Sequence, residues 1–253
     1  IRETNRIATS IPAAAAWLDV TTDTGADYWE ALQYVGRWTK ANHEVIHERF
    51  IERAGARQIT AFGNEHNFVW KRGDLFLHGK GATPAWKDES GSPLLGLIPL
   101  NMAAPILVTL GRDNADFLSF APHGAGRNQS RTATMRDFRK ANGENDDRGI
   151  EKAIADATRG LDIRWYYGKG DLSESPVGYK PAAQVRAQIE HFGLADVVAE
   201  VTPLGCIMAG DGGPQPWRRQ DHLTPKQKRQ IEHRADRRKE RQSIRHWETR
   251  DDD

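Results

Sequence analysis

The apolar residues of the chain change their spacing along its length, and each spacing predicts a different kind of element. From Ala26 to Ala54 large apolar side chains recur at three- and four-residue intervals, and Gly55 follows where a helix C-cap belongs. This pattern predicts one long packing helix. Between Gln58 and Val108 short apolar runs are broken by Gly, Pro and Asn, as is typical of strands. The predicted strands are Ile59–Phe62, Phe68–Trp70, Leu75–Leu77 and Ile106–Val108.

Helical spacing returns in the second half of the chain. The predicted helices are Ala133–Ala141, Gly149–Thr158 and Pro181–Phe192, the last followed by Gly193. Strands gathered in the middle and helices around them indicate an α+β fold with a strand-rich centre flanked by helices. A length of 253 residues is enough for one substantial core. We therefore expect one main domain over residues 1–215 and a separate tail over 216–253.

The tail is basic although the whole chain is nearly neutral. The formal net charge is +1, but from Arg218 onwards there are 12 Lys and Arg residues against 8 Asp and Glu residues. The part from Thr224 to Arg245 is rich in helix formers and almost free of apolar residues, so it is either a solvated helix or disordered. Two roles stay open: a solubilising tail, or a clamp for RNA phosphates.

Composition indicates the cellular compartment in which the protein is expected. The single cysteine, Cys206, cannot form an internal disulfide, which fits a reducing compartment. Mean hydropathy is −0.70, and the apolar run Ala103–Leu110 is far shorter than the roughly 20 residues of a membrane helix. We expect a cytoplasmic protein with no membrane partner. The first residue is Ile1 and no leader follows it, which we interpret as a piece of a longer polypeptide.

Two polar segments interrupt the strand-rich middle. In Asn64–Asn67 a histidine and asparagines stand between two apolar runs, where an imidazole can bind a metal and an amide can hold a phosphate oxygen. A structural histidine is the alternative reading. In His78–Thr83 two glycines flank Lys80, so that backbone can approach an anion closely. A plain hairpin turn would have the same composition.

A third polar segment, Pro122–Arg127, carries the most specific chemistry. Gly124 and Gly126 leave backbone amides unobstructed beside His123, and Arg127 and Arg131 are four residues apart. Amides and guanidinium groups can stabilise charge on phosphoryl oxygens while an imidazole attacks the phosphorus. A helix N-terminus with an incidental histidine explains the same residues equally well.

The combination of segments resembles the RtcB family of RNA ligases, and specifically its C-terminal half. His123-Gly-Ala-Gly-Arg127 followed by Ser130-Arg131 is similar to the family signature. His66-Asn67, Lys80–Thr83 and Glu174–Lys180 resemble further family motifs in the same order, and the helix with Ala41-Asn42 resembles one that ends in Ala-Asn-Arg. The resemblance spans roughly residues 10 to 210 and implies a partial RtcB-like fold.

The resemblance implies a ligase that depends on GTP and Mn²⁺. It would join RNA ending in a 2′,3′-cyclic phosphate or 3′-phosphate to RNA with a 5′-hydroxyl, and His123 would be the catalytic residue that carries GMP. His66 would bind manganese, and Asn67, Arg127 and Arg131 would contact RNA. The cofactor site would be formed by His66, Asn67, Pro99, Leu100, Asn101, Met102, His123, Gly124, Ala125 and Gly126.

The chain also departs from the family pattern. The family's other metal ligands, an Asp-x-x-Cys group and two histidine motifs, belong to an N-terminal half that we expect to be supplied in cis or in trans. Asn101 replaces a serine, and Gly205–Gly210 contains no lysine to pair with guanine. These departures indicate a divergent branch. Two alternative functions therefore stay open: a non-ligating remnant that binds RNA or a nucleotide, and a metal-dependent phosphoesterase.

Overall fold

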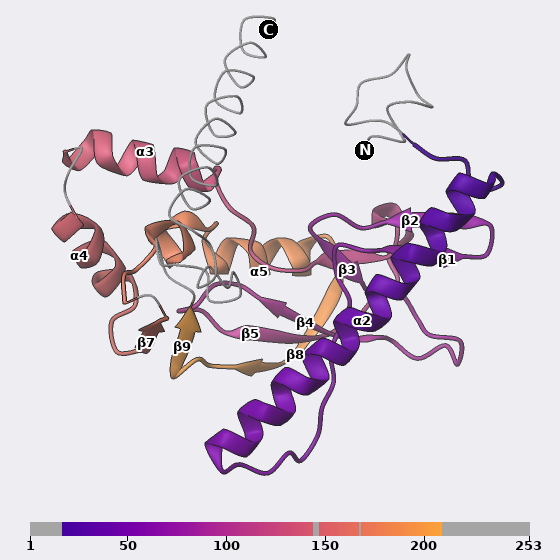
Figure 1. Ribbon diagram of the computed structural model, residues 1–253, viewed down its shortest axis with the longest axis horizontal. Coiled ribbons are helices and arrows are strands. Elements are labelled where there is room, and N and C mark those ends of the chain that lie inside the picture. Colours follow the sequence, from indigo (N-terminus) through magenta and orange to yellow (C-terminus); the bar gives the residue numbers. More distant parts are fainter. Residues whose placement is uncertain (1–16, 144–146, 167, 209–253) are drawn as a thin grey trace, which may run out of the picture. The chain divides into compact units, whose positions relative to one another are not determined.

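The computed structural model describes residues 17–143, 147–166 and 168–208 (Figure 1). The chain divides into two compact units. Among the described residues, the first unit contains everything up to Leu161 and the segment from Leu172 to Gly205. The second contains the described part of Asp162–Asp171 and the residues from Cys206. Helices and strands occur together, so the expected α+β class is confirmed.

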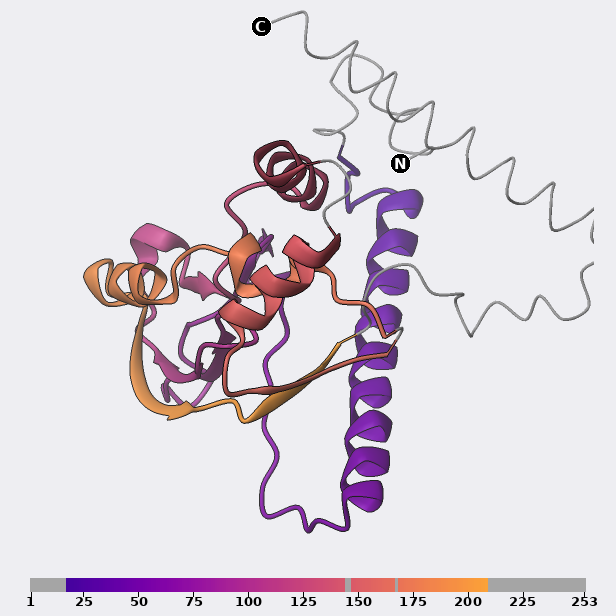
Figure 2. The same cartoon turned by 90° about the vertical axis from the view of Figure 1, so that its left-hand side faces the viewer.

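The first element is the long helix α2, Asp23–Ala54, which is one uninterrupted helix in Figure 2. The Thr22 side chain accepts a hydrogen bond from the Gly25 amide and caps its N-terminus. Gly55 has a φ of 61° and donates its amide to the Glu52 carbonyl, so it ends the helix in the left-handed conformation that glycine adopts without strain. The helix and its C-cap predicted from the sequence are confirmed.

Two small antiparallel pairs follow the helix. Strands β1 (Val69–Arg72) and β2 (Leu75–His78) form a hairpin whose turn contains Gly73. Strand β3 (Ala82–Pro84) pairs with β6 (Phe120–Pro122). An aromatic cluster fixes these strands together: Trp70 lies 5.8 Å from Trp86 and 5.4 Å from Phe120 between ring centroids. The pairing of β3 with β6 brings two segments about 40 residues apart to one place.

The core lies against a three-stranded antiparallel sheet. Its order is β4 (Leu95–Pro99), β5 (Ile106–Gly111) and β8 (Ala195–Val201), with a bulge at Val108/Thr109. Helix α5, Ala182–His191, contributes two buried side chains to the same core. The buried core residues are Ala85, Ile98, Leu100, Leu107, Ala121, Ala125, Val185, Ile189 and Ala195.

The remaining elements are short. Helix α3 spans Arg131–Asn142 and helix α4 spans Asp147–Ala157. Single 3₁₀ turns lie at Ala115–Phe117, Leu172–Glu174 and Pro176–Gly178. In the second unit β7 (Asp162–Trp165) pairs with β9 (Gly205–Met208). The three predicted helices of the second half are confirmed, with ends that differ by one to a few residues.

One predicted strand is wrong. Residues 59–62 form no strand, and Ile59 is 87% exposed, because this segment finds no neighbouring strand among the described residues. Strand β8 was missed, since its sequence follows α5 directly and its pairing with β5 is long-range. No described helix is both long enough and apolar enough to cross a membrane. The predicted tail, 216–253, lies outside the described residues.

Gly111 gives a test of the core packing. A Cβ atom at this position would lie 2.2 Å from the Ala85 carbonyl oxygen, which is backbone and cannot rotate away. We expect Gly111→Ala to lower the free energy of unfolding by about 2–3 kcal/mol, because the strand must shift. Gly63→Ala is the matched control, since a Cβ there meets nothing within 4 Å. Equal urea midpoints for both variants would contradict this packing.

Candidate active site

Two histidines far apart in the sequence meet at one place. His66 lies in the segment between α2 and β1, and His123 directly follows β6. Their rings are stacked, with centroids 4.9 Å apart and an angle of 4° between the planes. His66 is exposed and His123 is half-buried. The structure therefore brings together the predicted metal ligand and the predicted nucleophile.

The turn Lys80-Gly81-Ala82 connects the two histidine segments. The His123 amide donates to the Gly81 carbonyl over 3.2 Å. On the other side the Asn67 side-chain oxygen accepts from the Gly81 amide over 2.7 Å, and the Asn67 amide donates to the Ala82 carbonyl. Asn67 has a φ of 53°, in the left-handed region that asparagine tolerates better than most residues. Gly81 is thus hydrogen-bonded to both histidine segments, through the Asn67 side chain and the His123 amide.

Hydrogen bonds of Asn64 and Thr83 hold the His66 segment in place. Thr83 is buried, receives a hydrogen bond from the Asn64 side chain over 2.6 Å and donates to the Glu65 carbonyl over 2.8 Å. Asn64 also bonds the backbone of Leu97 in β4, as donor and as acceptor. The Asn64–Asn67 segment is therefore held on the sheet although it has no regular secondary structure.

The surroundings of His123 favour its neutral form. Burial lowers the pKa of His123 below its ordinary value, and the positive charges of His66 and Lys80 lower it further. A neutral imidazole has a nitrogen lone pair that can attack phosphorus or bind a metal. Lys80 would in addition attract a phosphate to this place.

The predicted nucleotide segment after β4 lies against the loop of His123. A Cβ at Gly124 would stand 3.0 Å from the Pro99 carbonyl oxygen, so only glycine allows this approach easily. The Leu100 side chain is buried in the core, so only the backbone of this residue could contact a ligand. The Asn101 side-chain oxygen accepts from the Ala103 amide over 2.9 Å and shapes the following turn. Met102 is partly buried in this turn.

The rest of the signature loop is fixed by the Glu174–Lys180 segment. Ala125 is buried in the core, whereas Gly126 is exposed with a φ of 72°. The Gly126 carbonyl accepts from the Lys180 amide over 3.0 Å. A Cβ at Gly126 would lie 4.0 Å from Lys180 Nζ, so this ammonium group stands beside the loop. Lys80 and Lys180 thus place positive charge beside the loop.

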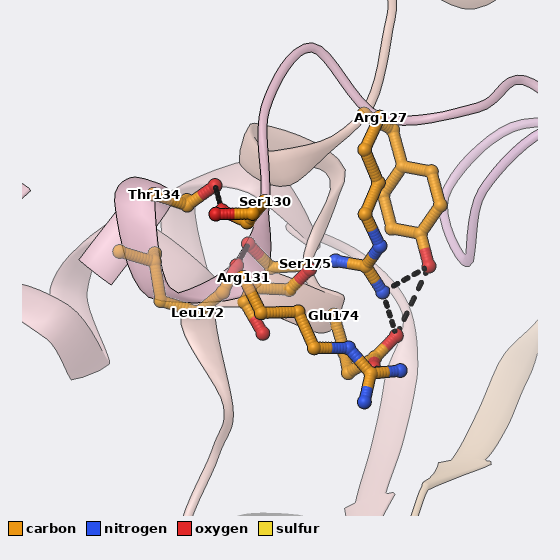
Figure 3. A network of polar contacts seen from close by, with 9 residues as sticks. Arg127, Ser130, Arg131, Thr134, Leu172, Glu174 and Ser175 are labelled. Atoms are coloured by element: carbon orange, nitrogen blue, oxygen red, sulfur yellow. Dashed lines mark hydrogen bonds and ion pairs between the residues drawn. The ribbon is translucent and has the colours of Figure 1, made fainter. Parts of the chain in front are cut away.

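The two signature arginines converge on one carboxylate (Figure 3). Arg127 donates to Glu174 Oε2 over 2.8 Å and to the Tyr179 hydroxyl over 3.1 Å, and its guanidinium lies 4.7 Å from the centre of the Tyr179 ring. Arg127 also donates to the Ser173 carbonyl. Arg131, the first residue of α3, pairs with the other oxygen, Glu174 Oε1. Two cations therefore share one anion.

The two arginines differ in exposure. The Arg127 side chain is 22% exposed and the Arg131 side chain 66% exposed. Burial raises the pKa of Tyr179, and its hydrogen bond to Glu174 acts in the same direction, so the hydroxyl stays a donor at neutral pH. In the sequence, Glu174 and Tyr179 stood out only as part of the Glu174–Lys180 segment that resembles a family motif. Nothing in that segment indicated that Glu174 pairs with both arginines. A long-range ion pair leaves no spacing signal in a single sequence.

The residues do not suffice for a manganese site. Within 17–143, 147–166 and 168–208, no group of three or more His, Cys, Asp and Glu side chains is arranged to hold a metal ion. His66 and His123 supply at most two nitrogen ligands, and a stable metal site needs more. Any further ligands must come from outside the described residues.

These features define an α+β protein with a paired-histidine site suited to phosphate chemistry. Comparison with known proteins assigns the family: the model of the family described as tRNA-splicing ligase RtcB matches residues 3–209, and the chain belongs to this family. The resemblance inferred from the motifs is thereby confirmed. The observed α+β elements are consistent with a partial RtcB-like fold.

Individual relatives are distant and longer. The chain is 28% identical over 215 residues to the RNA-splicing ligase RtcB of Mycobacterium bovis, which covers 76% of this chain and 47% of the relative. It is 29% identical over 196 residues to the tRNA-splicing ligase RtcB of Pyrococcus horikoshii, covering 70% of this chain and 21% of that protein. The chain thus spans less than half the length of these curated relatives.

Proposed function

We propose that the chain is the histidine-bearing half of a GTP-dependent RNA ligase. The observation that carries the proposal is the stacking of His66 on His123 within a family whose relatives are named RNA-splicing and tRNA-splicing ligases. The positive charges of Lys80 and Lys180 beside the His123 loop support binding of nucleotide and RNA phosphates there.

In the proposed first step a nitrogen of His123 attacks the α-phosphorus of GTP. A P–N bond forms, the bond to the β-phosphate oxygen breaks, and pyrophosphate leaves. A lowered pKa supports this role, because the attacking nitrogen must carry a lone pair. Backbone amides of Ala125 and Gly126 would face the GMP phosphate.

In the second step an oxygen of an RNA 3′-phosphate attacks the GMP phosphorus, and the P–N bond to His123 breaks. The 5′-hydroxyl of the other RNA then attacks the 3′-phosphate, loses its proton and releases GMP. Asn67, Arg127 and Arg131 would hold RNA phosphates during these steps. Asn67 can use its side-chain nitrogen, since its oxygen is bonded to Gly81.

Manganese would supply Lewis-acid stabilisation of the phosphate charge when bound. In this chain we assign only His66 to it. The proposal therefore requires the remaining ligands from the complementary half of the ligase domain, on the same polypeptide or on another. A cytoplasmic, reducing compartment fits the single cysteine Cys206.

A ligation assay tests the function. The chain is mixed with the complementary half of the domain, GTP, Mn²⁺ and two RNA strands, one with a 3′-phosphate or 2′,3′-cyclic phosphate and one with a 5′-hydroxyl. We expect a joined product that is absent when either GTP or the 5′-hydroxyl is omitted. A product that forms without GTP would contradict the proposed intermediate.

The absence of a metal cluster within the described residues favours a second function, an RNA- or nucleotide-binding remnant. Such a remnant would bind RNA with a 3′-phosphate but form no covalent GMP adduct and no joined product. Binding without either reaction, in the presence of the complementary half, would therefore establish the second function in place of the first.

The basic tail offers a further test on RNA. Deleting residues 218–253 removes 12 Lys and Arg against 8 Asp and Glu residues. We expect RNA affinity to fall several-fold at about 50 mM salt and to change little at several hundred mM, because exposed cations act through counterion release. Fluorescence anisotropy with labelled single-stranded RNA measures this. An unchanged affinity at low salt would make the tail a solubiliser only.

A further inference from the structure

Glu174 is the anion that joins the two signature arginines, and it has no part in the phosphate chemistry proposed above. Its Oε2 accepts from Arg127 over 2.8 Å and from the Tyr179 hydroxyl over 3.0 Å. Its Oε1 pairs with Arg131. The Glu174 side chain is only 17% exposed, so both of its oxygens are used within the protein. A carboxylate placed in this way decides how the arginines meet any other anion.

The local fold holds this carboxylate in place. Glu174 ends the 3₁₀ turn that begins at Leu172. The Ser175 hydroxyl donates to the Leu172 carbonyl over 2.7 Å, and both residues are fully buried. Arg131 is the first residue of α3, whose N-terminus is capped by the Ser130 side chain (Figure 3). The two partners therefore stand on elements that are themselves fixed.

The arginines differ in their freedom to leave Glu174. Arg127 also donates to the Ser173 carbonyl and lies 4.7 Å from the centre of the Tyr179 ring, so it stays in place when one contact is lost. The Arg131 side chain is 66% exposed and can turn towards solvent. An anion from solution would therefore reach Arg131 first.

A phosphate and a carboxylate compete for the same group on an arginine. The guanidinium fork binds two oxygens of either anion in the same geometry. An RNA phosphate at Arg131 must therefore share this side chain with Glu174. Two positive side chains and one negative side chain leave a single net positive charge, whereas loss of the carboxylate would leave two. Glu174 thus weakens the attraction of this cluster for RNA.

We propose that Glu174 is a positioning residue that aligns Arg127 and Arg131 and competes with an RNA phosphate for Arg131. The carboxylate keeps two like charges side by side that would otherwise repel each other. It also limits how strongly the cluster holds RNA, so that a joined strand is released more readily. The inference rests on the proposed function in taking an RNA phosphate as the anion.

RNA binding without chemistry tests the proposal. The full chain is titrated with labelled single-stranded RNA that ends in a 3′-phosphate, in EDTA and without GTP, and fluorescence anisotropy is measured. We expect Glu174→Gln to bind this RNA about three- to tenfold more tightly at about 50 mM salt and to raise the salt dependence by about one counterion. A merely structural role would give weaker binding instead. The glutamine oxygen can still accept from Arg127, so the variant should fold, with a lower unfolding midpoint.

Two further variants locate the effect. Glu174→Asp keeps the negative charge, so its salt dependence should equal that of the parent chain; a rise as in Glu174→Gln would overturn the proposal. In an Arg131→Ala background, Glu174→Gln should lose most of its effect on RNA affinity. The reason is that Arg127 remains held by the Ser173 carbonyl and the Tyr179 hydroxyl.

Asp137→Asn is the matched control. Asp137 lies on α3 and pairs with Arg136, so this variant removes the same charge from another arginine of that helix. It should leave RNA affinity within about twofold of the parent, because exposed charges are screened. Unchanged or weaker RNA binding by Glu174→Gln, an equal gain in Asp137→Asn, or the full gain without Arg131 would overturn the proposal. Tighter binding by Glu174→Gln in a chain that forms no covalent GMP adduct would keep this inference and refute the ligase function.

Discussion

We expect His123→Ala to abolish covalent labelling when the chain and its complementary half are incubated with Mn²⁺ and α-labelled GTP. The imidazole is the group that we expect to form the P–N bond, and no described neighbour can replace it: His66 is stacked on it as a proposed metal ligand. Loss of a nucleophile typically costs several orders of magnitude in rate. Label that survives denaturation in the parent chain and disappears in the variant is the expected result.

His78→Ala is the control for this experiment. His78 ends β2, is exposed, and lies outside the histidine pair. It should keep full labelling, and both variants should keep the circular dichroism spectrum of the parent. Retention of label in His123→Ala would refute the assignment of the nucleophile. Labelling of the chain without its complementary half would show that this half suffices for the first step, against our expectation.

The local elements of the fold could be predicted from the sequence because their signals are local. The apolar spacing and Gly55 located α2 and its C-cap. The apolar runs Phe68–Trp70 and Leu75–Leu77 located the strands β1 and β2. Each of these elements forms its hydrogen bonds within a few residues, so the information needed lies in one short stretch of sequence.

The long-range pairings could not be predicted in this way. An apolar run becomes a strand only when a neighbour offers its backbone, and residues 59–62 have none in the described part of the chain, whereas β8 finds β5. The two segments differ in whether the folded chain places a strand beside them, and a single sequence does not show this.

The candidate site shows the same division. The motifs identified His66 and His123, but their stacking involves Gly81, which bonds the Asn67 side chain in one segment and the His123 amide in the other. The motifs also placed Arg127 and Arg131 together without showing that Glu174 pairs with both. The motifs thus indicated which side chains to expect at the site, and the structure shows how these side chains are paired and which are exposed.

Arg127 and Arg131, four residues apart in the signature, should therefore respond differently to substitution. Arg127→Ala removes four contacts around a half-buried carboxylate, with Glu174 Oε2, the Tyr179 hydroxyl, the Tyr179 ring and the Ser173 carbonyl. We expect it to lower the free energy of unfolding by about 2–4 kcal/mol, since a charged group loses its main partner. Arg131→Ala should cost less than about 1 kcal/mol, because its side chain is mostly exposed.

On RNA both substitutions should weaken use of the 3′-phosphate end more than GMP transfer to His123, but by different routes. Arg131 is exposed enough to reach a phosphate while it stays near Glu174, so Arg131→Ala should lower the salt dependence of RNA binding by about one counterion. Arg127→Lys keeps the charge but loses the fork that bonds Glu174 and Tyr179 together, so it should restore little of the lost stability. Urea unfolding and anisotropy titrations over a range of salt separate these effects. Equal loss of stability in the two alanine variants would contradict the division of roles, because it would mean that Arg131 is as firmly held by Glu174 as Arg127 and is not available to RNA.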